Sequence, residues 1–397
     1  MRPERAPLLR RGPGPAGVAA SRPGRGLRPG EDGDVRAGAE DVLRHLPGAA
    51  RLPDRHVPQA RRVSPGPPPA SPAHWKGRRV LVTGGGGFLG TWFARRLAEI
   101  GAEVVAVHRP RPEGPLPDGL GDGWALAEAD LRSPAEVESL LRGPAAGTDT
   151  VVHCAAVYGD SAFKRRHGGT LLAANTRLVS TVLDAARRHG AGTLVLISST
   201  EVYSAALTGP IREEDDHRAR PDLSGDGYAL AKVFAELLAD EYRREFGMTV
   251  FTARPANVYG PGDGLGPRPP LAVPAMLRRL AAGEPVPVWG GGRQRRSFVH
   301  VEDMVEAVLQ MVASGAFDTF NVAAPGTVSM LELAHLVAAE FGAPDRVELR
   351  PDLPGGPPVR EFDTTRMRRV VDFEPRPLRT GIADTVRWFR EGGGGPR

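Results

Sequence analysis

The sequence predicts an α/β fold in which a doubly wound parallel sheet is followed by a smaller C-terminal α/β lobe. From Trp75 onwards, short apolar runs alternate with segments of helical spacing, a pattern typical of parallel strands that helices cover on both faces. A glycine-rich turn follows the first apolar run. Beyond residue 254 the alternation is less regular and richer in proline. We therefore assign residues 76–254 to the sheet and residues 255–390 mainly to the lobe.

Apolar spacing predicts the elements in chain order. The predicted strands are residues 80–82, 103–107, 124–129, 150–155, 193–198 and 249–254. The predicted helices are residues 91–100, 134–142, 171–189, 228–246, 275–282 and 330–341. We expect the lobe to cap the carboxyl edge of the sheet.

Residues 1–74 are predicted to be a disordered tail, because proline, glycine and arginine dominate and apolar periodicity is missing. The next methionine after Met1 is Met248, so a start nearer Val57 or Val63 is an alternative to a translated tail. A functional tail is the third possibility.

Charge and cysteine content exclude several classes of protein. The tail carries 13 arginines against 7 acidic residues, while the whole chain has a net charge of +5, so the folded body is nearly neutral and no nucleic-acid-binding face is expected. The single cysteine, Cys154, excludes an internal disulfide framework and favours a reducing compartment. No run of 18 apolar residues exists, so we expect no membrane span and a cytoplasmic location. No metal site is expected, and His153 is interpreted as a packing residue.

The glycine-rich turn at residues 83–90 lies between the first predicted strand and the first predicted helix. Gly84 allows a tight turn, Gly87 lets backbone N–H groups approach a pyrophosphate, and Gly90 permits close packing of helix on strand. A strand before the turn and a helix after it are the context that such a site needs. We therefore expect a Rossmann-type site for a nicotinamide dinucleotide.

The residues after the second predicted strand favour NADP(H) over NAD(H). An acidic residue usually ends this strand and binds the ribose 2′-hydroxyl, but His108 and Arg109 stand here. Loss of the carboxylate and gain of a cation suit a 2′-phosphate, with a solvated loop arginine as the alternative. Asp130 and Leu131 follow the third predicted strand and are placed to contact the adenine.

The pair Tyr228 and Lys232 lies four residues apart on one face of a predicted helix. A phenol with its ordinary pKa is a poor base at neutral pH. A nearby ammonium and a positively charged nicotinamide both favour the phenolate and lower that pKa. The phenolate can then take a proton from a hydroxyl as hydride leaves the carbon, and Ser199, at the carboxyl end of a predicted strand, can hydrogen-bond the reacting oxygen.

These motifs together resemble the extended short-chain dehydrogenase/reductase superfamily, in its nucleotide-sugar epimerase/dehydratase branch. The resemblance covers about 315 residues, nearly everything after the tail. The matching segments, in order, are the glycine turn at 83–90, H-x-A-A at 153–156, Asn175, S-S-x-x-V-Y at 198–203, Y-x-x-x-K at 228–232, R-P-x-N-V-Y-G-P at 254–261 and R-x-F-x-H-V-x-D at 296–303.

The resemblance implies a role for each matching residue. Tyr228 is implied to be the base, Lys232 its activator and ribose anchor, and Ser199 the hydroxyl partner. Asn257 and Arg296 are implied to hold the nucleotide diphosphate, with Arg360 as a further candidate. The cofactor-binding candidates are Gly84, Gly87, Phe88, Leu89, Gly90, His108, Arg109, Asp130, Leu131, Ala155, Ala156, Asn175, Tyr228 and Lys232.

A guanidinium can bind a phosphate through two parallel hydrogen bonds, which supports Arg296 independently. The alternative is a surface arginine beside Arg293 and Arg295. The implied partners are a nucleotide-diphosphate sugar and a second copy of the chain, which would bind through helices 171–189 and 228–246.

The reaction stays open among 4-epimerase, 4,6-dehydratase, decarboxylase, 3,5-epimerase and 4-ketoreductase. Most of these enzymes oxidise C4 transiently, because a 4-keto group acidifies the neighbouring C–H bonds. Glu201 matches the acid/base carboxylate of dehydratases and decarboxylases, with a solvated carboxylate as the alternative. However, Thr200 stands where dehydratases often have aspartate.

The stretch 273–298 is similar to GDP-fucose synthases and GDP-mannose 3,5-epimerases, although the cysteine that those epimerases use after the S-S pair is absent. The synthases use NADPH, so a 4-ketoreductase is the main alternative reading. A reductase of a non-sugar carbonyl compound and a nucleotide-binding regulator without turnover are the remaining alternatives.

Overall fold

The computed structural model describes residues 72–109, 123–207, 209–218, 226–264, 271–353 and 355–393. The predicted tail lies outside the described residues up to residue 71. Its last three residues, Pro72–His74, form a short 3-10 helix, η1, where disorder was predicted. The reason is the neighbouring Trp75, whose buried indole donates a hydrogen bond to the Leu309 carbonyl at 3.3 Å and anchors the chain to the core.

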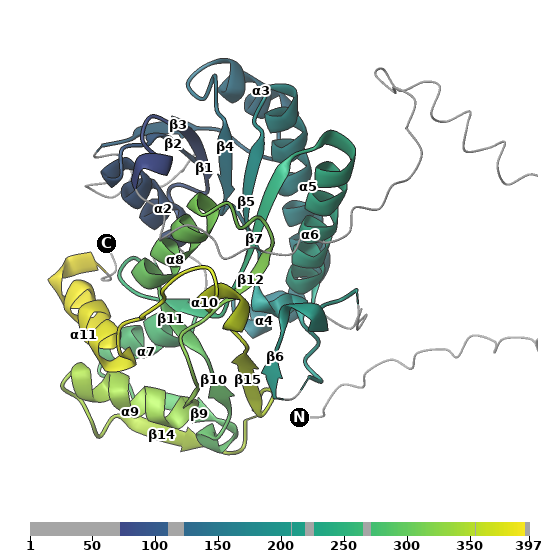
Figure 1. Ribbon diagram of the computed structural model, residues 1–397. Helices are drawn as coiled ribbons and strands as arrows, with labels where there is room; N and C mark the ends of the chain where they lie inside the picture. Colours follow the sequence, from purple (N-terminus) through teal and green to yellow (C-terminus); the bar gives the residue numbers. More distant parts are fainter. Residues whose placement is uncertain are drawn as a thin grey trace, which may run out of the picture. The chain divides into compact units, whose positions relative to one another are not determined.

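A seven-stranded sheet forms the centre of the described part (Figure 1). The strand order is β12-β7-β5-β4-β1-β2-β3, and all neighbouring strands are parallel. The chain order reverses between β1 and β4, and ligands of such sheets bind outside the carboxyl ends of the strands at that point. The strands are β1 (Arg79–Thr83), β2 (Glu103–His108), β3 (Ala125–Glu128), β4 (Thr150–His153), β5 (Thr193–Ile197), β7 (Thr249–Pro255) and β12 (Thr319–Val322).

Helices cover both faces of this sheet, which confirms the predicted doubly wound fold (Figure 1). Successive side chains of a strand point to opposite faces, so Val80 and Val82 enter one core and Leu81 enters the other. The first core contains side chains of α2 (Phe88–Glu99) and α8 (Val301–Ala313), and the second contains those of α3 (Pro134–Arg142), α5 (Gly168–Arg188) and α6 (Gly227–Phe246).

Local capping explains where two helices begin. Helix α3 covers the predicted residues 134–142, because the Ser133 hydroxyl accepts a hydrogen bond from the Glu136 N–H and Pro134 suits the first turn. At the start of α6, the Asp226 carboxylate accepts from the N–H groups of Tyr228 and Ala229, each at 3.0 Å. This cap places Tyr228 in the first turn of α6, near the carboxyl edge of the sheet.

The smaller lobe has its own core. It contains a four-stranded sheet in the order β13-β10-β15-β6 and a two-stranded sheet of β14 and β9, and a further two-stranded sheet joins β11 to β8. The strands are β6 (Pro210–Ile211), β8 (Asn257–Tyr259), β9 (Val286–Trp289), β10 (Arg295–Arg296), β11 (Phe298–His300), β13 (Val328–Ser329), β14 (Val347–Arg350) and β15 (Val359–Phe362). The helices are α7 (Ala272–Ala281), α9 (Met330–Glu340), α10 (Thr365–Arg368) and α11 (Leu378–Trp388).

The chain crosses between the sheet and the lobe more often than a single boundary at residue 254 implies. Strand β12 and helix α8 belong to residues 255–390, yet both lie on the large sheet. Strand β6 belongs to residues 76–254, yet it pairs with β15 of the lobe. Helices α4 (Ser161–Arg166), α8, α10 and α11 were not predicted. Among the described helices, none combines the length and the apolar character that crossing a membrane requires.

Candidate active site

The glycine turn between β1 and α2 has the geometry that a pyrophosphate needs. Gly84 has a φ of +72°, and a Cβ on Gly90 would lie 2.2 Å from the Gly84 carbonyl oxygen, so neither position accepts a side chain without a shift. Gly87 precedes α2 as its N-cap, and no side chain caps the helix there. The first N–H groups of α2, including those of Phe88 and Leu89, are therefore available to an anion. The residues present thus fit a dinucleotide.

The adenine end of the predicted site lies at the carboxyl ends of β2 and β3. His108 ends β2, and its ring nitrogen Nδ1 lies 2.9 Å from the Arg109 carbonyl oxygen. Arg109 is exposed. Asp130 receives two hydrogen bonds from the Arg132 Nε and another from its NH2 group, which hold the pKa of Asp130 down at about 2. Leu131 is buried beside it. The Arg109 charge also helps to lower the pKa of Asp130.

The loop after β4 is held by groups from two other elements. The Thr83 hydroxyl accepts from the Ala155 N–H at 3.2 Å and lies 3.0 Å from the buried His153 ring, so His153 packs as the sequence indicates. Asn175 accepts from the Val157 N–H at 2.7 Å and donates to the carbonyls of Val157 and Leu171. Asn175 is buried and its amide is fully engaged, so it positions this loop, which carries Ala155 and Ala156.

Tyr228 and Lys232 lie on one face of α6, as their spacing predicts. The Lys232 ammonium is 5.7 Å from the centre of the Tyr228 ring and donates to the Ile197 carbonyl at 2.7 Å. Burial lowers the pKa of Lys232 to about 8. The hydrogen bond to the end of β5 therefore fixes a partly desolvated cation beside the phenol.

Ser199 joins the same group from the end of β5. Its hydroxyl lies close enough to Tyr228 to lower the pKa of the phenol, and it accepts from the Glu201 N–H at 3.1 Å. It is thus both the cap of the short helix η2 (Thr200–Val202) and a partner of the phenol. The structure brings Ser199, Tyr228 and Lys232 together.

The surroundings of Tyr228 change the pKa of its hydroxyl. Desolvation of the hydroxyl raises the pKa of Tyr228 above its ordinary value, the Glu201 carboxylate raises it further, and the Ser199 hydrogen bond opposes the rise. Burial is therefore the largest influence on the pKa of Tyr228 in this structure.

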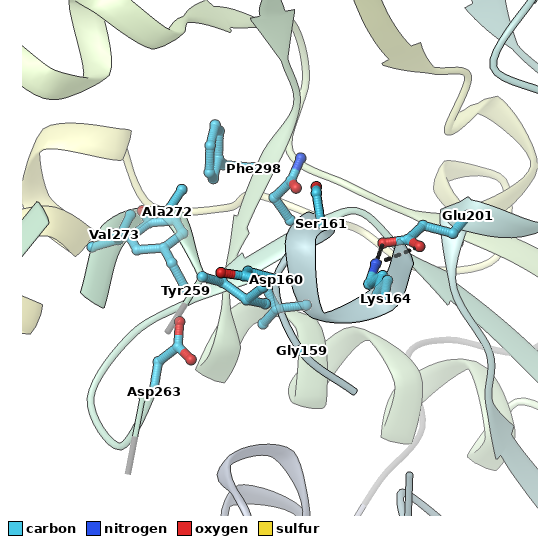
Figure 2. Close-up of a pocket in the computed structure, with 13 residues that line it drawn as sticks. Gly159, Asp160, Ser161, Lys164, Glu201, Tyr259, Asp263, Ala272, Val273 and Phe298 are labelled. Carbon is cyan, nitrogen blue, oxygen red and sulfur yellow. Dashed lines mark hydrogen bonds and ion pairs between the residues drawn. The ribbon is translucent and has the colours of Figure 1, made fainter. Parts of the chain in front are cut away.

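A pocket lies between α4 and the lobe, and its lining includes Lys164, Glu201 and Asn257. Figure 2 shows Lys164 and Glu201 together on one side and Tyr259 on the other. The Lys164 ammonium donates to both carboxylate oxygens of Glu201, at 2.6 Å for Oε2. The same ammonium lies 4.8 Å from the centre of the Tyr228 ring. The phenol therefore has a second lysine beside it, and Glu201 faces that lysine.

Lys164 is the residue of this site that sequence reasoning missed. A signal was present: 49 of the 52 basic residues are arginine and only Lys76, Lys164 and Lys232 are lysine. In a chain that uses arginine almost everywhere, a lysine is a candidate for a position where the cation type matters. In the run Lys164–Arg166, Lys164 is buried and the two arginines are exposed.

The three predicted substrate-binding residues do not all present free polar groups. Arg296 and Arg360 are register partners on β10 and β15, and within the described ranges neither forms an ion pair with a carboxylate. Burial lowers the pKa of both, and for Arg360 the Arg296 charge adds to this effect. Arg360 donates to the carbonyls of Ser204 and Thr200 at 2.7 and 3.0 Å, so it also holds the loop that carries Glu201. The Asn257 amide donates to the Ser297 carbonyl at 2.8 Å at the pocket wall.

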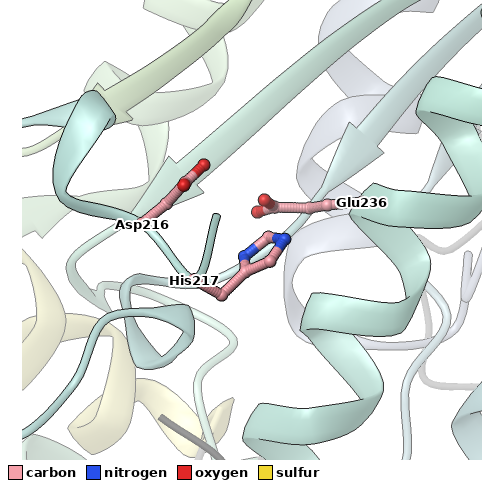
Figure 3. A group of neighbouring side chains, drawn as sticks. All are labelled: Asp216, His217 and Glu236. Atoms are coloured by element: carbon pink, nitrogen blue, oxygen red, sulfur yellow. The ribbon is translucent and has the colours of Figure 1, made fainter. Parts of the chain in front are cut away.

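One group of side chains has the composition of a metal site. Ligand atoms of Asp216, His217 and Glu236 lie within 4.8 Å of one another (Figure 3). Both carboxylates are ion-paired with the fully buried Arg254, at 2.9 Å for Asp216, and Arg218 lies close to both. Because guanidinium groups already balance this charge, we interpret the group as a structural network. It reaches the site through Ser198, whose hydroxyl donates to Glu236 at 2.5 Å.

Comparison with known proteins agrees with this fold. The sequence model of the NAD dependent epimerase/dehydratase family matches residues 80–323. The chain is similar to a dTDP-4-dehydro-6-deoxy-D-allose reductase of Streptomyces bikiniensis, with 44% identity over 80% of this chain and 97% of that one. It is also similar to a dTDP-glucose 4,6-dehydratase of Streptomyces niveus, with 31% identity over 79% of this chain and 93% of that one.

Among solved structures, the dTDP-glucose 4,6-dehydratase DesIV of Streptomyces venezuelae, solved with NAD bound, has a TM-score of 0.68 and 27% identity over 80% of this chain and 98% of that one. The chain belongs to the NAD-dependent epimerase/dehydratase family of extended short-chain dehydrogenases/reductases. It is an NAD(P)-dependent enzyme of that type.

Proposed function

We propose that this protein is an NADPH-dependent 4-ketoreductase that acts on a thymidine-diphosphate-linked 4-dehydro-6-deoxyhexose. The observation that carries the proposal is the Tyr228 hydroxyl beside Lys232, whose ammonium lies 5.7 Å from the centre of the Tyr228 ring and is held by the Ile197 carbonyl. Ketone reduction needs a proton donor at this place, whereas alcohol oxidation needs a base. The reductase named for the Streptomyces bikiniensis relative supports the same direction and the same class of substrate.

The chain's own residues supply the proton and orient the ketone. A reduced nicotinamide, when bound, supplies hydride to C4 of the sugar. Tyr228 donates its proton to the C4 oxygen, and Ser199 donates a hydrogen bond to the same oxygen. Lys232 stabilises the resulting phenolate with its ammonium group, which the Ile197 carbonyl holds in place. The C4 oxygen becomes a hydroxyl. Tyr228 then carries the negative charge as a phenolate until it is reprotonated.

We propose that the large sheet binds the cofactor and that the lobe holds the nucleotide diphosphate. Arg296 and Arg360 are adjacent, partly desolvated cations without a carboxylate partner among the described residues. Such a pair suits the two phosphates of a nucleoside diphosphate. Asn257 adds a polar group to the wall of the pocket.

The test is oxidation of NADPH with a panel of nucleotide sugars. We expect turnover with dTDP-linked 4-dehydro-6-deoxyhexoses and none with dTDP-glucose or with UDP- and GDP-linked hexoses that lack a keto group. Consumption of dTDP-glucose without net use of added cofactor would instead identify a dehydratase. Turnover of a ketone that lacks the nucleotide would identify a reductase of non-sugar carbonyl compounds.

The preference for NADPH is proposed to depend on Arg109. Replacing Arg109 by alanine should raise the KM for NADPH by about 10- to 100-fold, because one charge-assisted hydrogen bond to the 2′-phosphate contributes about 1.5–3 kcal/mol. The KM for NADH should not change. The matched control is Arg142→Ala, which removes an exposed arginine from the end of α3. An equal rise in the KM for NADPH and for NADH would show that Arg109 does not bind the 2′-phosphate.

We propose that the protein is a homodimer and acts in the cytoplasm. Helices α5 and α6 lie side by side on one face of the sheet (Figure 1), and α6 exposes Phe234, Leu237 and Phe246. Exposed apolar side chains on one helix suit a subunit interface. Light scattering should give twice the chain mass of 42.3 kDa, and a single-chain mass would exclude the dimer.

A further inference from the structure

Lys164 is held in the active-site wall by its local structure. The Asp160 carboxylate caps α4 by accepting from the Phe163 N–H at 2.7 Å. This starts a short helix in which the side chain of Lys164 is only 10% exposed. A buried ammonium is costly unless it is paired, and Glu201 is the carboxylate that pairs with it.

The pairing engages both carboxylate oxygens of Glu201. Both carboxylate oxygens accept hydrogen bonds from the single ammonium group. Figure 2 shows the two side chains joined across the pocket wall, one from α4 and the other from the loop after β5. Glu201 is also close enough to Tyr228 to act on its ionisation. The carboxylate therefore lies next to the place where a sugar ketone would meet the phenol.

A free carboxylate at this place would be chemically active. A ketone acidifies the C–H bonds on either side of it, and a nearby carboxylate is a competent general base. In a reductase such a base would compete with hydride transfer, because it would exchange the proton at a carbon beside the ketone or invert that stereocentre. In the structure Glu201 is not free, because the Lys164 ammonium donates to both of its carboxylate oxygens.

We infer that Lys164 determines reaction specificity: its ammonium masks the Glu201 carboxylate and so confines the site to ketone reduction. This inference rests on the proposed function, because it assumes a keto sugar in the pocket. Lys164 acts through Glu201 and is therefore a positioning residue. Arginine could carry the charge, but a compact ammonium fits between the two oxygens and the Tyr228 ring.

Removing the Lys164 ammonium should allow a proton transfer between the sugar and Glu201 in which atoms and charge balance. The C–H bond beside the ketone breaks and its proton goes to Glu201, while the electron pair moves to the ketone oxygen to form an enolate. The Tyr228 hydroxyl can hydrogen-bond that oxygen. Glu201 exchanges its proton with solvent and returns one to the same carbon. In D2O the sugar therefore gains deuterium, and no oxidant or reductant is consumed.

The experiment incubates the full-length enzyme in D2O with NADP⁺ and dTDP-4-dehydro-6-deoxyglucose, and mass spectrometry measures deuterium in the sugar. Lys164→Met should take up deuterium about 100-fold faster than the wild type, the scale that a general base contributes. Lys164→Gln is assayed beside it, so that poor folding of one variant does not decide the result. The double variant Lys164→Met/Glu201→Gln should take up deuterium no faster than the wild type. Lys164→Arg, which keeps the positive charge, should also keep deuterium uptake slow.

The outcomes separate this inference from the proposed function. NADPH oxidation by the wild type tests the reductase, and failure there leaves the deuterium measurement intact because exchange needs only a bound ketone. Folded Lys164→Met and Lys164→Gln variants that exchange no faster than the wild type would overturn the inference. Fast deuterium uptake that persists in the double variant would also overturn the inference, because the base would then not be Glu201.

Discussion

Replacing Tyr228 by phenylalanine is expected to lower kcat for ketone reduction by about 10²- to 10⁴-fold, the contribution of a positioned general acid. The substitution removes only the hydroxyl that Ser199 hydrogen-bonds. The ring remains, so packing of α6 against the end of β5 is retained. Steady-state NADPH oxidation with the dTDP-linked 4-keto sugar measures the effect.

Tyr242→Phe is the matched control for that variant. Tyr242 lies on the same helix, α6, and its ring packs beside Phe246 at 5.0 Å, away from Ser199 and Lys232. Its kcat should equal that of the wild type. A Tyr228→Phe enzyme with wild-type kcat would remove the proton donor from the mechanism, and the proposed reductase chemistry with it.

Replacing Arg254 by methionine is expected to have the largest effect on folding, about 3–5 kcal/mol of unfolding free energy. The Arg254 guanidinium is 0% exposed and the Glu236 carboxylate with which it pairs is 1% exposed. It also pairs with Asp216 at 2.9 Å. Without the cation these carboxylates remain buried with too little positive charge. Equilibrium unfolding in urea measures the loss.

Arg218→Met separates charge from burial. Arg218 lies near the same carboxylates, at 3.5 Å from Asp216, but its side chain is 43% exposed. An ion pair in contact with water contributes about 0–1 kcal/mol, so the loss should be several-fold smaller than for Arg254. Equal losses in the two variants would contradict the structural role assigned to the buried arginine, and stabilisation by added divalent metal would favour a metal site instead.

Much of the cofactor site could be predicted from the sequence because its determinants are local. The turn from Gly84 to Gly90 depends on the spacing of residues within one strand–helix connection, and the structure confirms that no side chain fits at these two positions. Helix α3 begins and ends at the predicted residues because Ser133 and Pro134 form its start. Tyr228 and Lys232 share a face because four residues complete about one turn of a helix.

The pairing of Lys164 with Glu201 could not be predicted, because 37 residues separate them in the chain. The same holds for Arg360, whose hydrogen bonds to the loop after β5 span about 160 residues. The sequence placed Arg360 with the substrate, while the structure shows that its NH groups also hold the loop carrying Glu201. Contacts of this kind depend on which strands become neighbours, and local patterns of residues do not contain that information.

The sequence by itself determined the doubly wound sheet, the dinucleotide turn and the shared helix face of Tyr228 and Lys232, since each follows from periodicity or spacing over a few residues. Only the tertiary structure decided the burial of Tyr228 and the pairing of Glu201 with Lys164. The physical reason is that desolvation and the charges close to a group depend on which segments the fold brings together. Folding the chain buries the phenol, which raises the pKa of Tyr228, and sets the Lys164 ammonium against both oxygens of Glu201.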